Sequence, residues 1–182
     1  MKAPAQDMPR STRRRATVSG LARAALAGAV IVSLGGCGFQ LRGPVQLPFK
    51  TLYVQVPDSS PFGAELKRTI RASGSTKVVD RADQGEAILV IANEIRDKQI
   101  LSLGGGGRVR EFALRYRIVF RVHDGKAKEY IPLNELTLKR DFSFNDSQVL
   151  AKDAEEALLY KDMQSDAVQQ LVRRLQAART DS

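Results

Sequence analysis

The chain contains a single cysteine, Cys37, whose thiol is the most reactive group in the sequence. One thiol cannot form an intrachain disulfide, and with only one histidine, His123, the chain lacks the ligands of the usual structural zinc sites. The residues before Cys37 indicate a different chemistry. A basic stretch with three consecutive arginines precedes an apolar run over residues 24–34, and two glycines then lead to the cysteine. This order is typical of a secretory signal peptide.

The residues Leu34-Gly35-Gly36-Cys37 resemble the lipobox of bacterial lipoproteins, in which the thiol is acylated and the chain is cut just before it. The resemblance predicts a lipoprotein signal peptide over residues 1–36 and a lipid on Cys37. The apolar run is 11 residues long, whereas a membrane-spanning helix needs about 20. A permanent transmembrane segment is therefore not expected here.

Net charge separates the predicted signal peptide from the rest of the chain. The sequence carries 29 basic and 20 acidic residues, a net charge of +9 that invites a nucleic-acid interpretation. Six of the basic residues and one acidic residue precede Cys37, which leaves the following part at +4. An exported protein does not meet nucleic acid, so we expect no such partner.

Residues 37–50 predict an acylated cysteine followed by a tether, because prolines and glycines interrupt any regular element. The apolar residues of this tether are frequent enough that it should lie against its own domain or a partner. Residues 51–182 are predicted to form one α+β domain, since the length suits a single core. The first elements are a strand over 51–56 and a helix that begins at Ser60-Pro61 and ends at Gly74. Residues 77–79 are either a short strand or a connection.

Three long strands are predicted next, each with alternating side chains. The first runs from Ala87 to about Leu103, with Ile91, Asn93 and Ile95 on one face. The second, over 108–123, has the clearest period of two, with apolar residues on one face and mostly arginines on the other. The third follows Pro132.

A helix is predicted from about Val149 to Ala178, with charged residues opposite an apolar stripe. The stripe comprises Ala154, Ala157, Leu158, Met163, Ala167, Leu171 and Leu175. The order of elements predicts a two-layer α+β sandwich of about four mostly antiparallel strands, with two helices packed on one face.

The second long strand carries a cluster of arginines that could bind anions, since guanidinium groups pair bidentately with phosphate and carboxylate. They are Arg108, Arg110, Arg115, Arg117 and Arg121. The alternative is an ordinary solvated sheet face. The glycines over 104–107 do not resemble a phosphate loop, because a strand follows them, and they predict a hairpin tip.

Nothing in the sequence argues for an enzyme, a metal site or a cofactor. His123 lies beside Asp124 at a predicted turn, without a serine or cysteine nucleophile near it in sequence. An enzyme would need convergent titratable groups, which the sequence does not reveal.

The chain resembles the lipopolysaccharide-assembly lipoprotein family, LptE. The residues that carry the resemblance are Cys37-Gly38-Phe39-Gln40-Leu41-Arg42-Gly43 and Leu150-Ala151-Lys152-Asp153. The resemblance implies a lipid-anchored protein at the periplasmic face of the cell outer membrane. It also implies a role in plugging and assembling the large β-barrel partner LptD, and contact with lipopolysaccharide.

Through the second match, Lys152 is the first candidate for a lipopolysaccharide contact. Arg108 and Arg110 are further candidates, on their charge and their position at the hairpin tip alone. Another class of function stays open, a lipid-anchored periplasmic binding module for a different anionic ligand. Such a module should contain a closed apolar pocket and need no barrel.

Overall fold

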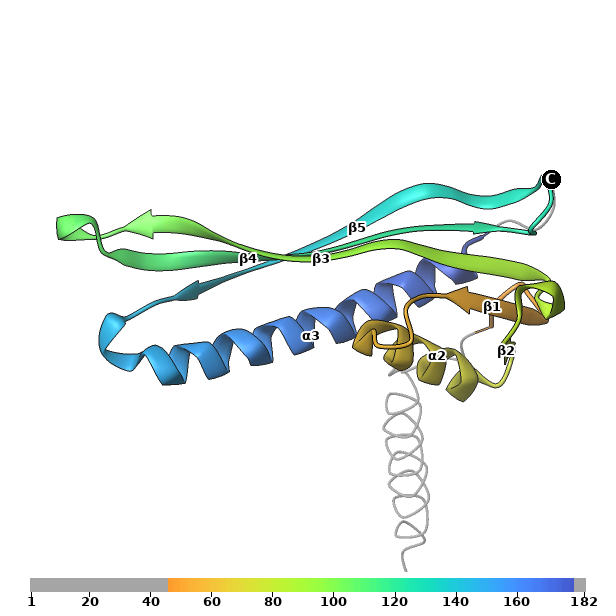
Figure 1. The fold of residues 1–182 in the computed structure, drawn as a ribbon, viewed down its shortest axis with the longest axis horizontal. Helices are drawn as coiled ribbons and strands as arrows, with labels where there is room; N and C mark the ends of the chain where they lie inside the picture. Colours follow the sequence, from red (N-terminus) through yellow and green to blue (C-terminus); the bar gives the residue numbers. More distant parts are fainter. Residues whose placement is uncertain (1–45, 179–182) are drawn as a thin grey trace, which may run out of the picture. The chain divides into compact units, whose positions relative to one another are not determined.

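The computed structural model describes residues 46–178, which form a five-stranded sheet with two helices on one face (Figure 1). The predicted signal peptide, Cys37 and the tether up to Val45 lie outside the described residues, as do residues 179–182. The two-layer α+β class is confirmed. The segment Lys77–Val79, which the sequence left open, is a strand, β2.

The first helix, α2 (Pro61–Ser73), follows strand β1 (Thr51–Gln55) and is bounded by the residues that the sequence indicated. The hydroxyl of Ser60 accepts the backbone N–H of Gly63 at 3.0 Å, which satisfies one free donor of the first turn. Gly74 ends the helix with a φ of 70°, a left-handed conformation that favours glycine.

The long strands are β3 (Ala87–Leu103), β4 (Val109–His123) and β5 (Glu129–Ser143). The strand order is β2-β1-β3-β4-β5; β1 is parallel to both neighbours, and the other pairs are antiparallel. The predicted start of the last strand after Pro132 is wrong, because β5 begins earlier and contains this proline. A proline is tolerated there because β5 is an edge strand whose pairing with β4 shifts in this region.

Strand β3 contains a β-bulge at Ala92, where its pairing with β4 shifts by one residue between Ile91 and Asn93. A bulge moves all later side chains to the opposite face of the strand. Ile95 therefore lies on the outer face, and the predicted alternation of Ile91, Asn93 and Ile95 on one face is wrong. The positions beyond the bulge that face the helices carry charges: Glu94, Arg96 and Lys98.

The last helix, α3 (Val149–Gln176), has the predicted extent, but only part of the predicted stripe is buried. The stripe is correct from Met163 to Leu175. Its earlier members Ala154, Ala157 and Leu158 are exposed, because residues 149–162 of α3, which we call the arm, turn polar side chains toward the sheet. No helix among residues 46–178 is both long and apolar enough to span a lipid bilayer.

The described chain divides into two halves that differ in burial. We call residues 96–115 and 138–162 the distal half, and the other described residues the proximal half. The proximal half holds 22 of the 25 buried hydrophobic residues, including Leu47 and Phe49 ahead of β1. The distal half holds three of them, Leu114, Leu138 and Phe142.

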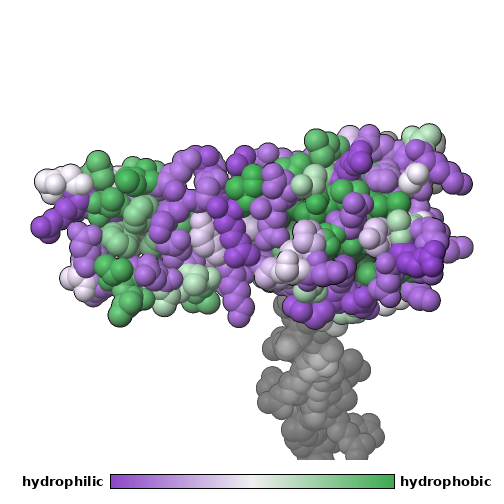
Figure 2. All heavy atoms as spheres, in the orientation of Figure 1, coloured by the Kyte–Doolittle hydropathy of each residue, from purple (hydrophilic) through white to green (hydrophobic). Residues whose placement is uncertain are grey.

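The distal half also exposes most of the large hydrophobic side chains at the surface of the described chain. They are Ile100, Leu101, Leu103, Val149, Leu150 and Leu158, whereas Leu133 is the one such residue in the proximal half. Figure 2 shows hydrophobic residues at the surface of the end that carries the β3–β4 hairpin tip.

Candidate functional site

Arg108 and Arg110 lie at the tip of the β3–β4 hairpin, where four glycines close the turn. Gly106 and Gly107 adopt φ values of 80° and 75°, which favour glycine. A Cβ at Gly104 would lie 2.6 Å from Nε of Arg110, so the arginine side chain is placed directly against the glycine backbone. Both arginines are exposed, and within residues 46–178 neither forms an ion pair.

The two arginines border an open groove of about 810 Å³ at the distal end. The groove runs between the hairpin tip and the turn that connects β5 to α3. Its lining comprises Ser102, Gly104, Gly105, Arg108, Val109, Arg110, Glu111, Ser143, Phe144, Asn145, Asp146 and Ser147. Glu111 and Asp146 are acidic, so the side of the groove next to the arginines is the one suited to an anion.

Lys152 lies at the border of this groove rather than in its lining. Its ammonium donates to the hydroxyl of Ser143, a lining residue, at 3.2 Å and to the Glu155 carboxylate at 2.8 Å. The side chain is 15% exposed and therefore held in place. The structure thus brings Lys152, Arg108 and Arg110 to one end of the molecule, although about forty residues separate them in sequence.

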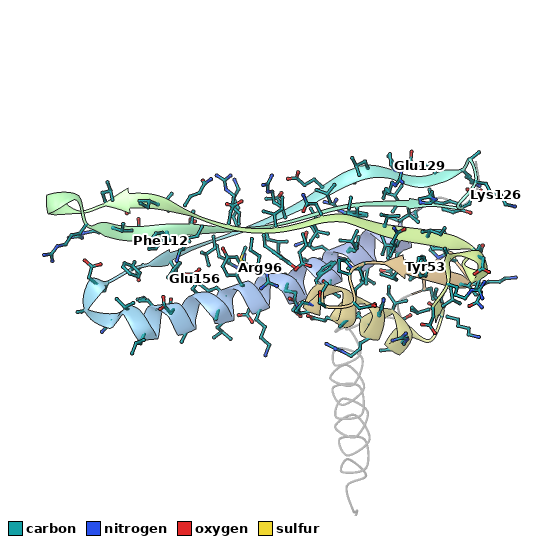
Figure 3. All side chains as sticks on the ribbon, viewed as in Figure 1. Tyr53, Arg96, Phe112, Lys126, Glu129 and Glu156 are labelled. Carbon is teal, nitrogen blue, oxygen red and sulfur yellow. The ribbon has the colours of Figure 1, made fainter. Side chains whose placement is uncertain are left out.

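An aromatic cluster adjoins the groove through Phe144, and sequence analysis did not single it out as a site. Phe144 lines the groove and meets Phe112 edge-on, with ring centroids 5.1 Å apart. Phe112 in turn stacks on Phe142 at 5.8 Å. Figure 3 labels Phe112, which points from β4 toward the arm. The signal available in the sequence was the recurrence of phenylalanine at positions 112, 142 and 144.

The five arginines of the 108–121 segment do not form one anion-binding surface. Arg115, Arg117 and Arg121 lie on the outer face of the sheet, away from the hairpin tip. Arg115 donates to the side chain of Gln99 at 2.6 Å, and the Arg117 guanidinium lies 3.8 Å from the Asp97 carboxylate. This part of the strand fits a partly neutralised, solvated sheet face, the alternative that the sequence left open.

A polar network lies at the border between the two halves, on the helix-facing side of the sheet. Glu94 accepts the hydroxyl of Tyr116 at 2.7 Å and that of Ser60 at 2.8 Å. Burial raises the pKa of Tyr116 well above its ordinary value, and the Glu94 carboxylate raises it further because it stabilises the protonated phenol.

Arg96 extends this network to the last helix. It donates to the Gln164 side chain at 2.9 Å, and Gln164 donates in turn to the Glu65 carboxylate of α2 at 2.7 Å. The Arg96 guanidinium also lies over the ring of Tyr116, 5.2 Å from its centroid. The network therefore joins the sheet to both helices. Figure 3 labels Arg96, which lies between the sheet and the helices. The network was missed in the sequence because its members come from four separate segments and depend on the bulge.

His123 has a structural role in the β4–β5 turn. Its Nδ1 accepts the backbone N–H of Gly125 at 2.9 Å. Within residues 46–178 no cluster of histidine, cysteine, aspartate or glutamate side chains is arranged to hold a metal ion.

Comparison with known proteins identifies a family. The LptE family model, described as lipopolysaccharide-assembly, matches residues 49–175. The chain is 30% identical over 153 residues to the LPS-assembly lipoprotein LptE of Photorhabdus laumondii, a match that covers 82% of each chain. It is 31% identical over 154 residues to the protein of the same name from Pectobacterium atrosepticum, with 81% of each chain covered.

Solved structures have the same fold. The solution structure of an uncharacterized lipoprotein B from Nitrosomonas europaea is 48% identical, with a TM-score of 0.67 over 77% of this chain and 91% of that one. The crystal structure of rare lipoprotein B from Shewanella oneidensis is 24% identical, with a TM-score of 0.59 over 69% and 92% of the respective chains. The second likeness concerns the fold alone.

Proposed function

The chain belongs to the LptE family of lipopolysaccharide-assembly lipoproteins, and we propose that it acts as the lipid-anchored partner of an LptD-type β-barrel and contacts lipopolysaccharide there. The family is one of non-enzymatic assembly proteins. The proposal concerns the finer steps of this role, namely the ligand contact, the membrane anchor and the barrel partner.

The observation that carries the ligand contact is the convergence of Arg108, Arg110 and Lys152 at the distal groove. Guanidinium groups pair bidentately with phosphate, and an ammonium adds a compact positive charge. Lipopolysaccharide carries phosphates on its lipid A, so the arginine side of the groove fits this ligand.

Charge reversal tests the contact. Hydrogen bonds to charged groups contribute about 1.5–3 kcal/mol each, so the double variant Arg108→Glu, Lys152→Glu should bind lipopolysaccharide at least about tenfold more weakly. Arg121→Glu is the matched control, because Arg121 is exposed but lies on the outer face of the proximal half. Unchanged binding by a folded double variant would overturn the contact.

The proposed anchor is the lipid on Cys37, which lies outside the described residues. One acyl chain binds a membrane only marginally, and stable anchoring takes more than one signal. A fully processed lipoprotein cysteine carries three chains, which is sufficient to hold the protein at the periplasmic face of the outer membrane. Cys37→Ser should yield a chain without lipid that leaves the membrane fraction, as intact mass and fractionation would reveal.

The proposed partner is a large β-barrel that this domain plugs. The lumen of an outer-membrane barrel is polar, and the distal half combines charged side chains with a solvated sheet face, which suits such a lumen. Purification of the tagged protein from detergent-solubilised outer membranes should recover a large β-barrel at equal stoichiometry. Recovery of the intact lipoprotein without a barrel would reject this partner and favour an anchored binding module for another anionic ligand.

A further inference from the structure

The aromatic cluster beside the groove is not explained by a phosphate contact. Phe144 faces the groove, and behind it Phe112 and Phe142 form a stacked pair. Phe142 is 6% exposed, and Phe112 and Phe144 are half-buried. A cationic groove that adjoins an apolar cluster is the pattern of a site for an amphiphile.

The two surfaces that meet under the arm are mismatched in polarity. The sheet contributes an apolar strip, which consists of Phe112, Leu114, Leu138 and Phe142. The arm contributes Lys152 and Glu156, and it turns Leu150 and Leu158 to solvent, with exposed fractions of 87% and 58%. No side chain of α3 ahead of Met163 is fully buried. Of the apolar residues of the arm, Leu159 and Tyr160 pack against the core and each is partly buried, so the helix side of this contact is less apolar than the strip.

The arm is joined to the sheet by exposed or partly buried contacts, which include Leu159 and Tyr160 against the core and several polar pairs. Lys98 donates to Glu156 at 2.6 Å, and the hydroxyl of Tyr160 donates to the backbone carbonyl of Asp97 at 2.8 Å. The Lys98–Glu156 pair is partly exposed, and such pairs contribute little to stability. Segments with few buried apolar contacts open locally while the rest of a domain stays folded. The arm can therefore move away from the strip while residues 163–175 of α3 stay packed.

We propose that this strip binds an acyl chain of lipid A. The acyl chain enters beside Phe144 and lies along Phe112 and Phe142 under the arm. The phosphates of the same lipid A molecule contact Arg108 and Arg110. This inference rests on the proposed function, since lipopolysaccharide is the ligand in both. The charge of the arginines and the continuity of the groove with the aromatic pair select an acylated phosphate as the occupant.

The absence of tryptophan from the sequence permits a direct test. Phe144→Trp introduces a single fluorescent reporter into the groove of the full lipidated chain. Leu133→Trp is the control, because Leu133 is a large apolar residue that is accessible to ligand but lies in the proximal half, away from the groove. Each variant is titrated with lipid A that carries a doxyl quencher on an acyl chain. We expect tryptophan fluorescence at position 144 to be largely lost and that at position 133 to be retained.

A second variant measures the contribution of the aromatic ring to binding. Phe144→Ala should weaken lipid A binding by about tenfold, a change equivalent to about 1.4 kcal/mol. Binding of deacylated, phosphorylated lipid A should not change. If Phe144→Trp fails to fold, Val109→Trp places the reporter in the same groove.

The outcomes separate this inference from the function on which it rests. If the unmodified protein does not bind lipid A, the proposed ligand contact is wrong. If the protein binds lipid A but the Phe144→Trp variant is no more quenched than the Leu133→Trp variant, the acyl-chain site is wrong and the phosphate contact stands. Equal binding of acylated and deacylated ligand would also overturn the acyl-chain site.

Discussion

The proximal and distal halves share β3, β4, β5 and α3, yet the same elements meet through different chemistry in each half. In the proximal half, α3 packs Met163, Ala167 and Leu171 against a sheet face that is mostly apolar. In the distal half, the same helix reaches the sheet through Lys152 and Glu156. The proximal half therefore supplies most of the stability of the fold, whereas the distal half keeps a loosely held surface for a ligand or a partner.

Truncation of one leucine in each half should give the largest contrast. Leu171 is fully buried, so Leu171→Ala should lower the free energy of unfolding by about 2–5 kcal/mol. Leu158 is 58% exposed in the arm, so Leu158→Ala should change the free energy of unfolding by no more than about 0.5 kcal/mol. Urea denaturation of the two variants checks the contrast. Equal losses would mean that the arm belongs to the cooperative core.

Substitution of glycine by alanine should also lower stability more in the proximal half than in the distal half. A Cβ at Gly63 would lie 2.5 Å from Cγ1 of Val56, so Gly63→Ala should destabilise the fold by about 1–3 kcal/mol through overpacking. Gly105 at the hairpin tip has no atom within 4 Å of such a Cβ, and its φ is not positive. Gly105→Ala should therefore be neutral in a thermal melt, and a large loss there would show that the tip is packed.

The polar network at the border should give an effect of intermediate size. Tyr116→Phe removes the hydrogen bond to Glu94, a loss of about 1 kcal/mol at neutral pH. Because the folded-state pKa of Tyr116 is raised, its contribution is full below pH 10, where the unfolded chain also keeps the phenol protonated. It is lost as the pH rises above 10.

Stability measured as a function of pH tests this assignment. The free energy of unfolding should fall above pH 10 in both proteins, but less steeply in Tyr116→Phe. Tyr130 and Tyr160, whose pKa values are also raised, remain in both proteins and serve as an internal control. Parallel curves would mean that Tyr116 ionises in the folded state as readily as in the unfolded state.

The smallest expected effect belongs to the Lys98–Glu156 pair, which links the arm to the sheet at 2.6 Å. A double-mutant cycle with Lys98→Met and Glu156→Gln should give a coupling energy of about 0.2–1 kcal/mol that decreases as salt is added. A coupling energy well above this range would contradict a loosely held arm and would narrow the difference between the halves.

Much of the fold could be predicted because local signals agreed with tertiary packing. Ser60, Pro61 and Gly74 set the bounds of α2, and the strict alternation over residues 109–123 predicted β4 and its buried face. Prediction failed where tertiary packing overrode the local pattern of apolar residues. The apolar character of Ala154 and Leu158 predicted burial, but the charges that β3 places opposite them turn another side of α3 toward the sheet.

Less of the candidate site could be predicted than of the fold. The charge and hairpin position of Arg108 and Arg110 indicated the tip, and the structure places both at a groove. The position of Lys152 beside Ser143 depends on how β5 leads into α3, which no local pattern specifies. The grouping of Phe112, Phe142 and Phe144 depends on the register between β4 and β5, which a single sequence leaves undetermined.

The extra residue Ala92 reverses which residues of β3, odd-numbered or even-numbered, face the helices. Up to that point the odd-numbered residues of β3 face the helices, and from there to Ile100, where the pairing shifts again, the even-numbered ones do. Deletion of this one residue would turn Glu94, Arg96 and Lys98 away from α3 and bring Ile95 and Asp97 beneath it. Residues of this strand in relatives with and without the extra residue correspond by the face they occupy, and an alignment that omits the gap would equate a helix-facing charge with a residue of the outer face.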